Sequence, residues 1–255
     1  MNRQVIGALL ATLGTWLTTA LGAGAPLFFP KCGRKHLNTM MGFASGVMIA
    51  ASFWSLLQPA VERSGNGPVP SWLVVTLGFL AGAAFLWASD KCIQLIKDNP
   101  PENRSVMLVL SITLHNIPEG LAVGVAFGAL TPGNSEALMA AISVAVGIGL
   151  QNFPEGAAVS LPLRREGSGK WKSFFIGQAS GIVEPIAGVA GAMLVSGAQR
   201  ILPYALSFAA GAMILVAVHD LIPECQKERD GCSYSSTGGI ICGFSVMTLL
   251  DVMLG

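Results

Sequence analysis

The chain has 255 residues, a formal net charge of +1 and 52% hydrophobic residues, and only 11% of its residues are charged. Ordinary soluble domains carry about 25% charged residues, so this composition excludes a typical soluble domain, and the nearly neutral charge gives no sign of a nucleic-acid partner. A mean hydropathy of +0.62 indicates an integral membrane protein.

Long stretches with few charges predict eight transmembrane helices, because about 20 apolar residues are enough for a helix to cross a bilayer. In chain order, the predicted spans are 5–28, 37–60, 71–90, 105–130, 135–163, 173–196, 201–223 and 236–254. Gly, Ala and Ser are frequent in several of them, which suits close packing of helices in lipid. We therefore predict an all-α integral membrane protein whose single polytopic domain covers residues 1–255.

The distribution of Lys and Arg predicts the orientation of these spans. One set of alternate loops contains 12 of these residues, and the other contains three, Arg3, Arg63 and Arg200. The positive-inside rule places the 12 in the cytoplasm and both termini outside. We expect the plasma membrane or a bacterial inner membrane, with an organelle membrane as the alternative. A signal peptide cleaved near residues 23–25 is a competing interpretation of the first span, but its removal would invert the charge bias.

The second and seventh spans share a short motif, FASGVMI at residues 43–49 and FAAGAMI at residues 208–214. Under the predicted orientation these two spans run in opposite directions, so the repeat is inverted in the membrane. Inverted repeats are typical of secondary transporters. The alternative is that helix faces made of small residues simply look alike. We predict an inverted repeat of helices 1–3 and 6–8 around a central pair of helices 4 and 5.

Two similar hexapeptides place carboxylates inside the fourth and fifth spans. They are HNIPEG at residues 115–120 and QNFPEG at residues 151–156. A carboxylate within lipid is costly, and by default it marks an ion pathway or a proton relay. His115 and Glu119 are four residues apart and share a helix face, and each proline frees the carbonyl four residues before it. If the two helices cross here, carboxylates, amides and one imidazole converge.

A divalent cation between Glu119 and Glu155 would remove the repulsion that otherwise forces one of these acids to hold a proton. Glu184, which precedes Pro185 in the sixth span, is the natural further ligand. One imidazole with carboxylates and amides suits Zn²⁺, Fe²⁺, Mn²⁺, Co²⁺ or Cd²⁺. The structural alternative is a pair of neutral carboxylic acids that holds the helices together.

Four further side chains are candidate ligands with a structural alternative. Asn116, Gln151 and Asn152 either bind the metal or form hydrogen bonds between helices. Met48, in the repeated motif of the second span, is either a soft metal contact or part of the apolar core.

The seventh span ends with polar residues near its predicted cytoplasmic end. His219, Asp220 and Glu224 form either an exit relay for the metal or a helix cap at the membrane interface. The chain has no P-loop motif, so transport would be driven by gradients or by proton exchange.

The paired hexapeptides and the Glu-Pro pair of the sixth span resemble those of the ZIP (Zrt-/Irt-like) divalent metal transporters, most of all the GufA-like branch. The resemblance covers essentially the whole chain, with its eight predicted spans and outside termini. It implies a secondary transporter that carries divalent metal, most of all zinc, into the cytoplasm by alternating access, without a resident cofactor. It also implies a homodimer and an elevator-like movement of spans 1, 4, 5 and 6 against spans 2, 3, 7 and 8.

The resemblance further implies two adjacent metal positions. The first would use His115, Glu119, Gln151 and Glu155, and the second would use Asn116, Asn152 and Glu184 and share Glu119 and Glu155. Met48 would line the first position, and Ser55 would line the transport pathway. In two respects the chain departs from many members: residues 91–104 contain no His, and Gln151 and Asn152 stand where some members have His or Asp.

Two other functions are compatible with buried acids. A membrane-embedded metal hydrolase would need an open metal position, usually held by several His, whereas this chain has three His and no HExxH motif. A proton or cation channel would use the glutamates as a selectivity ring. Saturable zinc flux that depends on Glu119 would distinguish a carrier from both.

Overall fold

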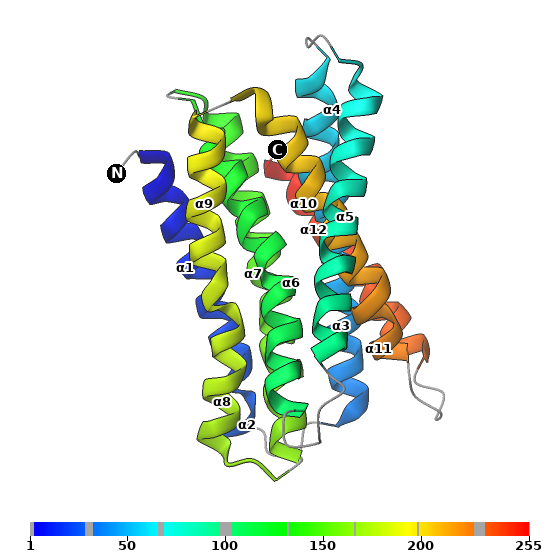
Figure 1. Cartoon of the computed structure of the whole chain (residues 1–255). Helices are drawn as coiled ribbons and strands as arrows, with labels where there is room; N and C mark the ends of the chain where they lie inside the picture. Colours follow the sequence, from blue (N-terminus) through cyan, green and yellow to red (C-terminus); the bar gives the residue numbers. More distant parts are fainter. Residues whose placement is uncertain are drawn as a thin grey trace.

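A computed structural model describes residues 3–28, 33–65, 69–96, 104–131, 133–165, 167–197, 199–226 and 233–254. All regular secondary structure in this part of the chain is helical (Figure 1). The longer helices are α1 (Arg3–Ala23), α3 (Arg34–Ala51), α5 (Ser71–Ile96), α6 (Arg104–Gly128), α7 (Ser135–Arg165), α9 (Val183–Gly197), α10 (Leu202–Val216) and α12 (Ser233–Leu254). The shorter ones are α2 (Ala25–Phe28), α4 (Gln58–Ser64), α8 (Lys170–Ala179) and α11 (Ile222–Gln226).

Among the described residues, seven helical segments are long and apolar enough to cross a membrane. The predicted class, an all-α integral membrane protein, is therefore confirmed. Helix α6 coincides with the predicted fourth span and lies inside the bundle (Figure 1), but it is not one of these seven segments. The count of eight crossings therefore stays a prediction.

Three of the spanning segments change their helical geometry part of the way across. Helices α3 and α10 each pass into a wider π-helical stretch, η1 (Ser52–Leu57) after α3 and η5 (Ala217–Leu221) after α10. Both stretches begin the same number of residues after the shared motif of residues 43–49 and 208–214. Between α8 and α9 a 3₁₀ turn, η3 (Ser180–Ile182), comes just before Glu184. Such irregular turns are frequent at functional sites.

The helices form two bundles that stand side by side (Figure 1). The α1 bundle contains α1, α2, α6, α7, α8 and α9, and its closest helix pairs are α1 with α7 and α6 with α9. The α3 bundle contains α3, α4, α5, α10, α11 and α12, and its closest pairs are α3 with α12 and α5 with α10. The bundles meet mainly where α3 packs on α7 and where α10 packs on α6.

Glycines bring the helices of each bundle into backbone contact. A Cβ atom at Gly22 of α1 would lie 1.9 Å from the carbonyl oxygen of Phe153 in α7, and one at Gly46 of α3 would lie 2.0 Å from a backbone oxygen of α12. Between the bundles the corresponding contact is softer, because a Cβ at Gly147 of α7 would meet the Sδ atom of Met247 in α12. Each bundle is therefore held together backbone to backbone, whereas the bundles touch through side chains.

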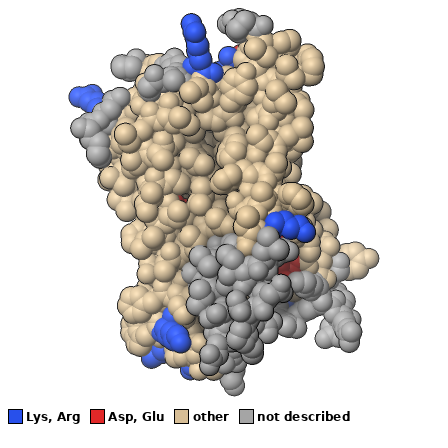
Figure 2. Space-filling model, viewed as in Figure 1, with Lys and Arg blue, Asp and Glu red and all other residues tan. Residues whose placement is uncertain are grey.

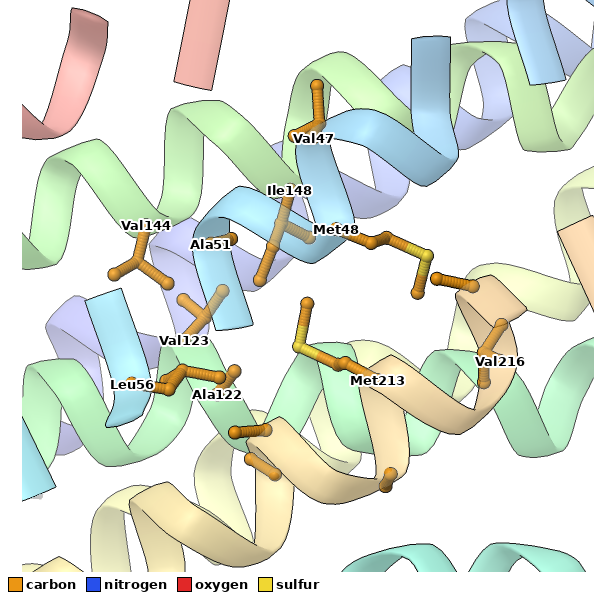
Figure 3. Packing of buried hydrophobic residues seen from close by; sticks show 14 of the residues in the cluster. Val47, Met48, Ala51, Leu56, Ala122, Val123, Val144, Ile148, Met213 and Val216 are labelled. Carbon is orange, nitrogen blue, oxygen red and sulfur yellow. The ribbon is translucent and has the colours of Figure 1, made fainter. Parts of the chain in front are cut away.

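The surface between the two bundles is apolar and tightly packed (Figure 3). Met48 of α3 and Met213 of α10 face Val123 of α6 and Ile148 of α7 there, and all four are fully buried. Because these side chains make no directional bonds, they fill space without fixing one relative position of the bundles.

Candidate cation site

The two hexapeptides lie within continuous helices, since α6 runs through Pro118 and α7 runs through Pro154. The carboxylates that follow these prolines are buried, with Glu119 0% exposed and Glu155 8% exposed. Glu184, in the first turn of α9, is also 0% exposed. The structure thus buries all three acids of the predicted site in the α1 bundle.

Helices α6 and α7 are joined by a hydrogen bond between their hexapeptides. The Nε2 atom of Gln151 donates to Oε1 of Glu119 over 2.7 Å. This bond fixes the orientation of the amide, because the reverse orientation would place two oxygens against each other. The second oxygen of each group, Oε2 of Glu119 and Oε1 of Gln151, is buried and has no hydrogen-bond partner.

Glu184 is held by three donors from α1 and α7. Its Oε2 atom accepts from the hydroxyl of Thr15 over 2.5 Å and from Nδ2 of Asn152 over 2.8 Å, and its Oε1 atom accepts from the hydroxyl of Thr19 over 3.3 Å. Nδ2 of Asn152 also donates to the carbonyl oxygen of Thr15 over 3.3 Å. With both amide protons used, Oδ1 of Asn152 is left buried and without a partner.

Five buried oxygens of the two hexapeptides lack a hydrogen-bond donor. They belong to Asn116, Glu119, Gln151, Asn152 and Glu155. A buried acceptor without a partner costs about 1–3 kcal/mol, and a charged one costs more. Five such atoms on two neighbouring helices indicate a place that is completed by a proton, by water or by a cation.

The electrostatics favour a cation. The carboxylates of Glu155 and Glu184 both lie close enough to Glu119 to repel its charged form. Because the surroundings have a low dielectric constant, this repulsion is strong unless positive charge is added. Carboxylate and amide oxygens are ligands for borderline and hard divalent ions. In the described part of the chain, no three His, Cys, Asp or Glu side chains are grouped closely enough to hold a metal by themselves, so the amides are needed to complete such a set.

His115 contacts the other bundle. Its Nε2 atom lies 3.2 Å from Oδ2 of Asp220 in η5. The predicted roles of His115 as a ligand and of Asp220 in an exit route are untested, but the contact shows that the two residues are neighbours. His219 in η5 and Glu224 in α11 are both exposed.

Met48 and Ser55 lie outside the cluster of acids. Met48 is part of the apolar surface between the bundles, beside Met213 (Figure 3). Ser55 lies in η1, where its hydroxyl donates to Asp251 of α12 over 2.9 Å. Ser55 and Asp251 line a cavity of about 470 Å³ that opens between the two bundles.

Sequence reasoning missed three residues around these sites. Thr15 and Thr19 bind Glu184, and the only signal in the sequence was their helical spacing on one face of an apolar helix. Asp251 accepts hydrogen bonds from Ser55 and from Ser143. An acid four residues before the last residue of the chain looks like an ordinary helix end, so it gave no signal.

Comparison with known proteins identifies the family. The profile of a family described as ZIP zinc transporter matches residues 100–251. The chain is 38% identical to zinc transporter ZIP11 of Homo sapiens, with 100% of this chain and 99% of that protein aligned. It is 35% identical to zinc transporter GufA of Myxococcus xanthus, with 97% and 98% covered, and 35% identical to zinc transporter ZIPB of Bordetella bronchiseptica, with 100% and 84% covered. These relatives are transporters and not enzymes, which removes the hydrolase alternative. The chain belongs to the ZIP family of transporters, as its motifs predict.

Proposed function

We propose that this protein is a secondary transporter that carries zinc into the cytoplasm by alternating access, with the ion bound among α6, α7 and α9 at mid-membrane. The observation that carries the proposal is the set of five partnerless buried oxygens on α6 and α7. A dication bound there would satisfy them and would offset the repulsion among Glu119, Glu155 and Glu184.

Zinc is the preferred cargo in this proposal because the related proteins are named zinc transporters. Oxygen ligands from carboxylates and amides do not select zinc alone, so Cd²⁺, Fe²⁺, Mn²⁺ and Co²⁺ are the expected competitors. The hydrogen bonds of Gln151 with Glu119 and of Asn152 with Glu184 support the two adjacent metal positions that the resemblance implies, because each bond pairs two of the side chains proposed as ligands.

The charge distribution supports the proposed orientation in the membrane, and the direction of transport, into the cytoplasm, comes from the resemblance. Lys35, Lys91, Arg164, Lys170 and Lys172 belong to loops and helix ends on the side of α2 and α8, whereas Arg3, Arg63 and Arg200 belong to the other side. On the face shown in Figure 2, charged side chains lie at the upper end, at the lower left end and in one group on the right beside the grey residues, and the rest of the described surface is almost entirely uncharged. The positive-inside rule then puts the α2 and α8 end in the cytoplasm. Both ends of the described chain lie at the opposite end (Figure 1), which agrees with outside termini.

Alternating access is supported by the division into two bundles. The α1 bundle contains all three buried glutamates, and it meets the α3 bundle mainly through apolar side chains, with polar contacts of His115 with Asp220 and of Ser143 with Asp251. Movement of one bundle along the other would carry the ion from the cavity beside Ser55 toward His219, Asp220 and Glu224. The inverted repeat fits the same picture, because the equivalent helices α3 and α10 run in opposite directions and have π-helical stretches at equivalent positions. A homodimer is part of this proposal through the resemblance alone.

Zinc flux into proteoliposomes that contain an entrapped fluorescent chelator tests the proposal. The wild-type protein should give saturable uptake, and Glu119→Ala should abolish it because a buried charged ligand is lost. Glu136→Ala is the matched control, since this glutamate is exposed at the start of α7, and it should keep most of the flux. Flux that rises linearly with zinc to high concentration would instead indicate a channel, and equal flux in wild type and Glu119→Ala would refute the proposed site.

A further inference from the structure

Helix α1 buries a row of threonines against the site. Thr12, Thr15 and Thr19 are spaced three and four residues apart and are at most 2% exposed. Thr12 donates its hydroxyl to the carbonyl of Ala8, which is the usual bond of a threonine inside a lipid-embedded helix. Thr15 and Thr19 differ because their hydroxyls also reach a carboxylate on another helix.

Each of these two hydroxyls has one proton and two acceptors within reach. Thr15 Oγ1 lies 2.5 Å from Glu184 Oε2 and 3.0 Å from the carbonyl oxygen of Thr12. Thr19 Oγ1 lies 3.3 Å from Glu184 Oε1 and 3.3 Å from the carbonyl oxygen of Thr15. A hydroxyl can donate to only one acceptor at a time and turns freely to choose it. Each hydroxyl can therefore break its hydrogen bond to Glu184 and still donate to a carbonyl oxygen of its own helix.

The backbones around this contact are fixed. A Cβ at Gly156 of α7 would lie 2.1 Å from the carbonyl oxygen of Thr19, and a Cβ at Gly120 of α6 would lie 2.5 Å from that of Glu184. The two helices of each pair, α7 with α1 and α6 with α9, cannot separate or rotate without breaking these contacts. An exchange of partners at Glu184 must therefore come from side-chain rotation.

We propose that Thr15 and Thr19 are positioning residues that take the place of the cation at Glu184 in the empty site and thereby set the affinity for the cargo. Without an ion, the two hydroxyls donate to the carboxylate and stabilise its charge. When a divalent ion takes a Glu184 oxygen, the hydroxyls turn to their own helix carbonyls, and they return when the ion leaves. The inference rests on the proposed function. It adds that the two hydroxyls and the ion compete for the Glu184 carboxylate, which favours release of the ion.

The contrast with the other two acids supports this role. Glu119 and Glu155 each have a buried oxygen without any partner, so an ion meets no competing donor there. Neither oxygen of Glu184 is free, because Thr15, Thr19 and Asn152 occupy them. Glu184 is thus the one acid of the three that must exchange a protein donor for the ion.

The test compares zinc affinity and transport in hydroxyl-deletion variants of the full-length protein. Thr15→Val keeps the shape of the side chain and removes the donor, so the empty site loses a charge-assisted hydrogen bond while the loaded site loses nothing. A bond of this kind corresponds to about a tenfold change in affinity. Calorimetric titration of the purified protein with Zn²⁺ should therefore show about tenfold tighter binding, and uptake should show a lower KM together with a lower kcat, because release is slowed.

Three further variants make the result interpretable. Thr15→Ser keeps the hydroxyl and should restore wild-type affinity. Thr12→Val removes a buried hydroxyl that bonds only within its helix, and it should leave the affinity unchanged. Thr19→Val removes the longer contact to Glu184 and should tighten binding by less than Thr15→Val, which keeps the test open if Thr15→Val does not fold.

Unchanged or weaker zinc binding in both Thr15→Val and Thr19→Val would overturn the inference, since the hydroxyls would then only pack the helix or support the bound ion. Equal zinc binding by the wild type and by Glu119→Ala would instead refute the proposed function. The two failures are therefore distinguishable.

Discussion

The α1 bundle and the α3 bundle bury their polar groups in different ways. In the α3 bundle, buried hydroxyls such as Ser45, Ser52 and Ser207 bond to carbonyls of their own helix. In the α1 bundle, buried side chains bond across helices, as Gln151 does to Glu119. The α3 bundle also has bonds between helices, such as Ser55 to Asp251, but the three fully or nearly buried glutamates all lie in the α1 bundle. Between the bundles, the directional contacts among the described residues include those of His115 with Asp220 and of Ser143 with Asp251, and most of the surface is apolar.

Locking the two bundles together should have the largest effect on transport. In a background where the five native cysteines are replaced by serine, cysteines at Gln58 of α4 and Ala137 of α7, which both line the cavity between the bundles, would be joined by a short bis-methanethiosulfonate cross-linker, whose disulfide bonds a reductant can cleave. We expect uptake to stop, because the ion site could no longer move relative to the α3 bundle, and a reductant should restore it. A cross-link within the α3 bundle, between Phe43→Cys and Ile240→Cys, should leave uptake intact. Full uptake with the bundles joined would show that they do not slide.

Removing one buried acid should weaken zinc binding by at least about 100-fold, since loss of even an outer-shell partner costs about 10–100-fold at metal sites. Glu155→Gln keeps the size of the side chain and removes the charge. Glu62→Gln is the comparison from the α3 bundle, because Glu62 is exposed and bonds only to Gln58 in the same helix. Titration with Zn²⁺ measures both variants. Equal affinities in the two would mean that the charge of the α1 bundle is not used for the ion.

The backbone contacts within the α1 bundle should be far less tolerant than the contact between bundles. Gly22→Ala forces a methyl group against the carbonyl of Phe153, and we expect a loss of stability of about 3 kcal/mol, the upper end for overpacking. Gly147→Ala meets only the flexible end of Met247 and should cost less than about 1.5 kcal/mol. Unfolding of the detergent-solubilised proteins by denaturant measures the difference. A reversed order would contradict the description of two internally rigid bodies.

Adding a negative charge to the site should strengthen zinc binding rather than weaken it, and this effect should be the smallest of the four. Asn152→Asp replaces an amide whose oxygen has no partner by a carboxylate. We expect about tenfold tighter zinc binding, a size typical of one charge-assisted interaction. A metal-competition uptake assay across a pH series, on the wild type and this variant, measures the change. Unaltered affinity would count against Asn152 as a ligand.

Much of the helical framework could be predicted because membrane spans are set by composition over about 20 residues. The predicted span 135–163 corresponds to α7 (Ser135–Arg165), and the burial of Glu119 and Glu155 followed from their apolar neighbours. Helix α5 continues to Ile96, six residues past its predicted end at residue 90, because a helix does not have to stop where its apolar stretch ends.

The partners within the site could not be predicted in the same way. Thr15 and Glu184 are far apart in the chain, and a threonine in a lipid-embedded helix is usually satisfied by its own backbone. The contact of His115 with Asp220 likewise depends on how two bundles dock. Their spacing places Glu119 and His115 on the same side of one helix. It does not show which of these two side chains contacts the other bundle.

The most direct test of the central claim is to locate the ion. Anomalous diffraction at the zinc absorption edge, from crystals of the protein loaded with Zn²⁺, measures its position independently of activity. The account predicts a peak about 2.0–2.2 Å from oxygens of both Glu119 and Glu155, with amide oxygens of the hexapeptides completing the shell. A peak found only beside Asp251 or beside His219, with the oxygens of Glu119 and Glu155 still bare in the zinc-loaded protein, would contradict it.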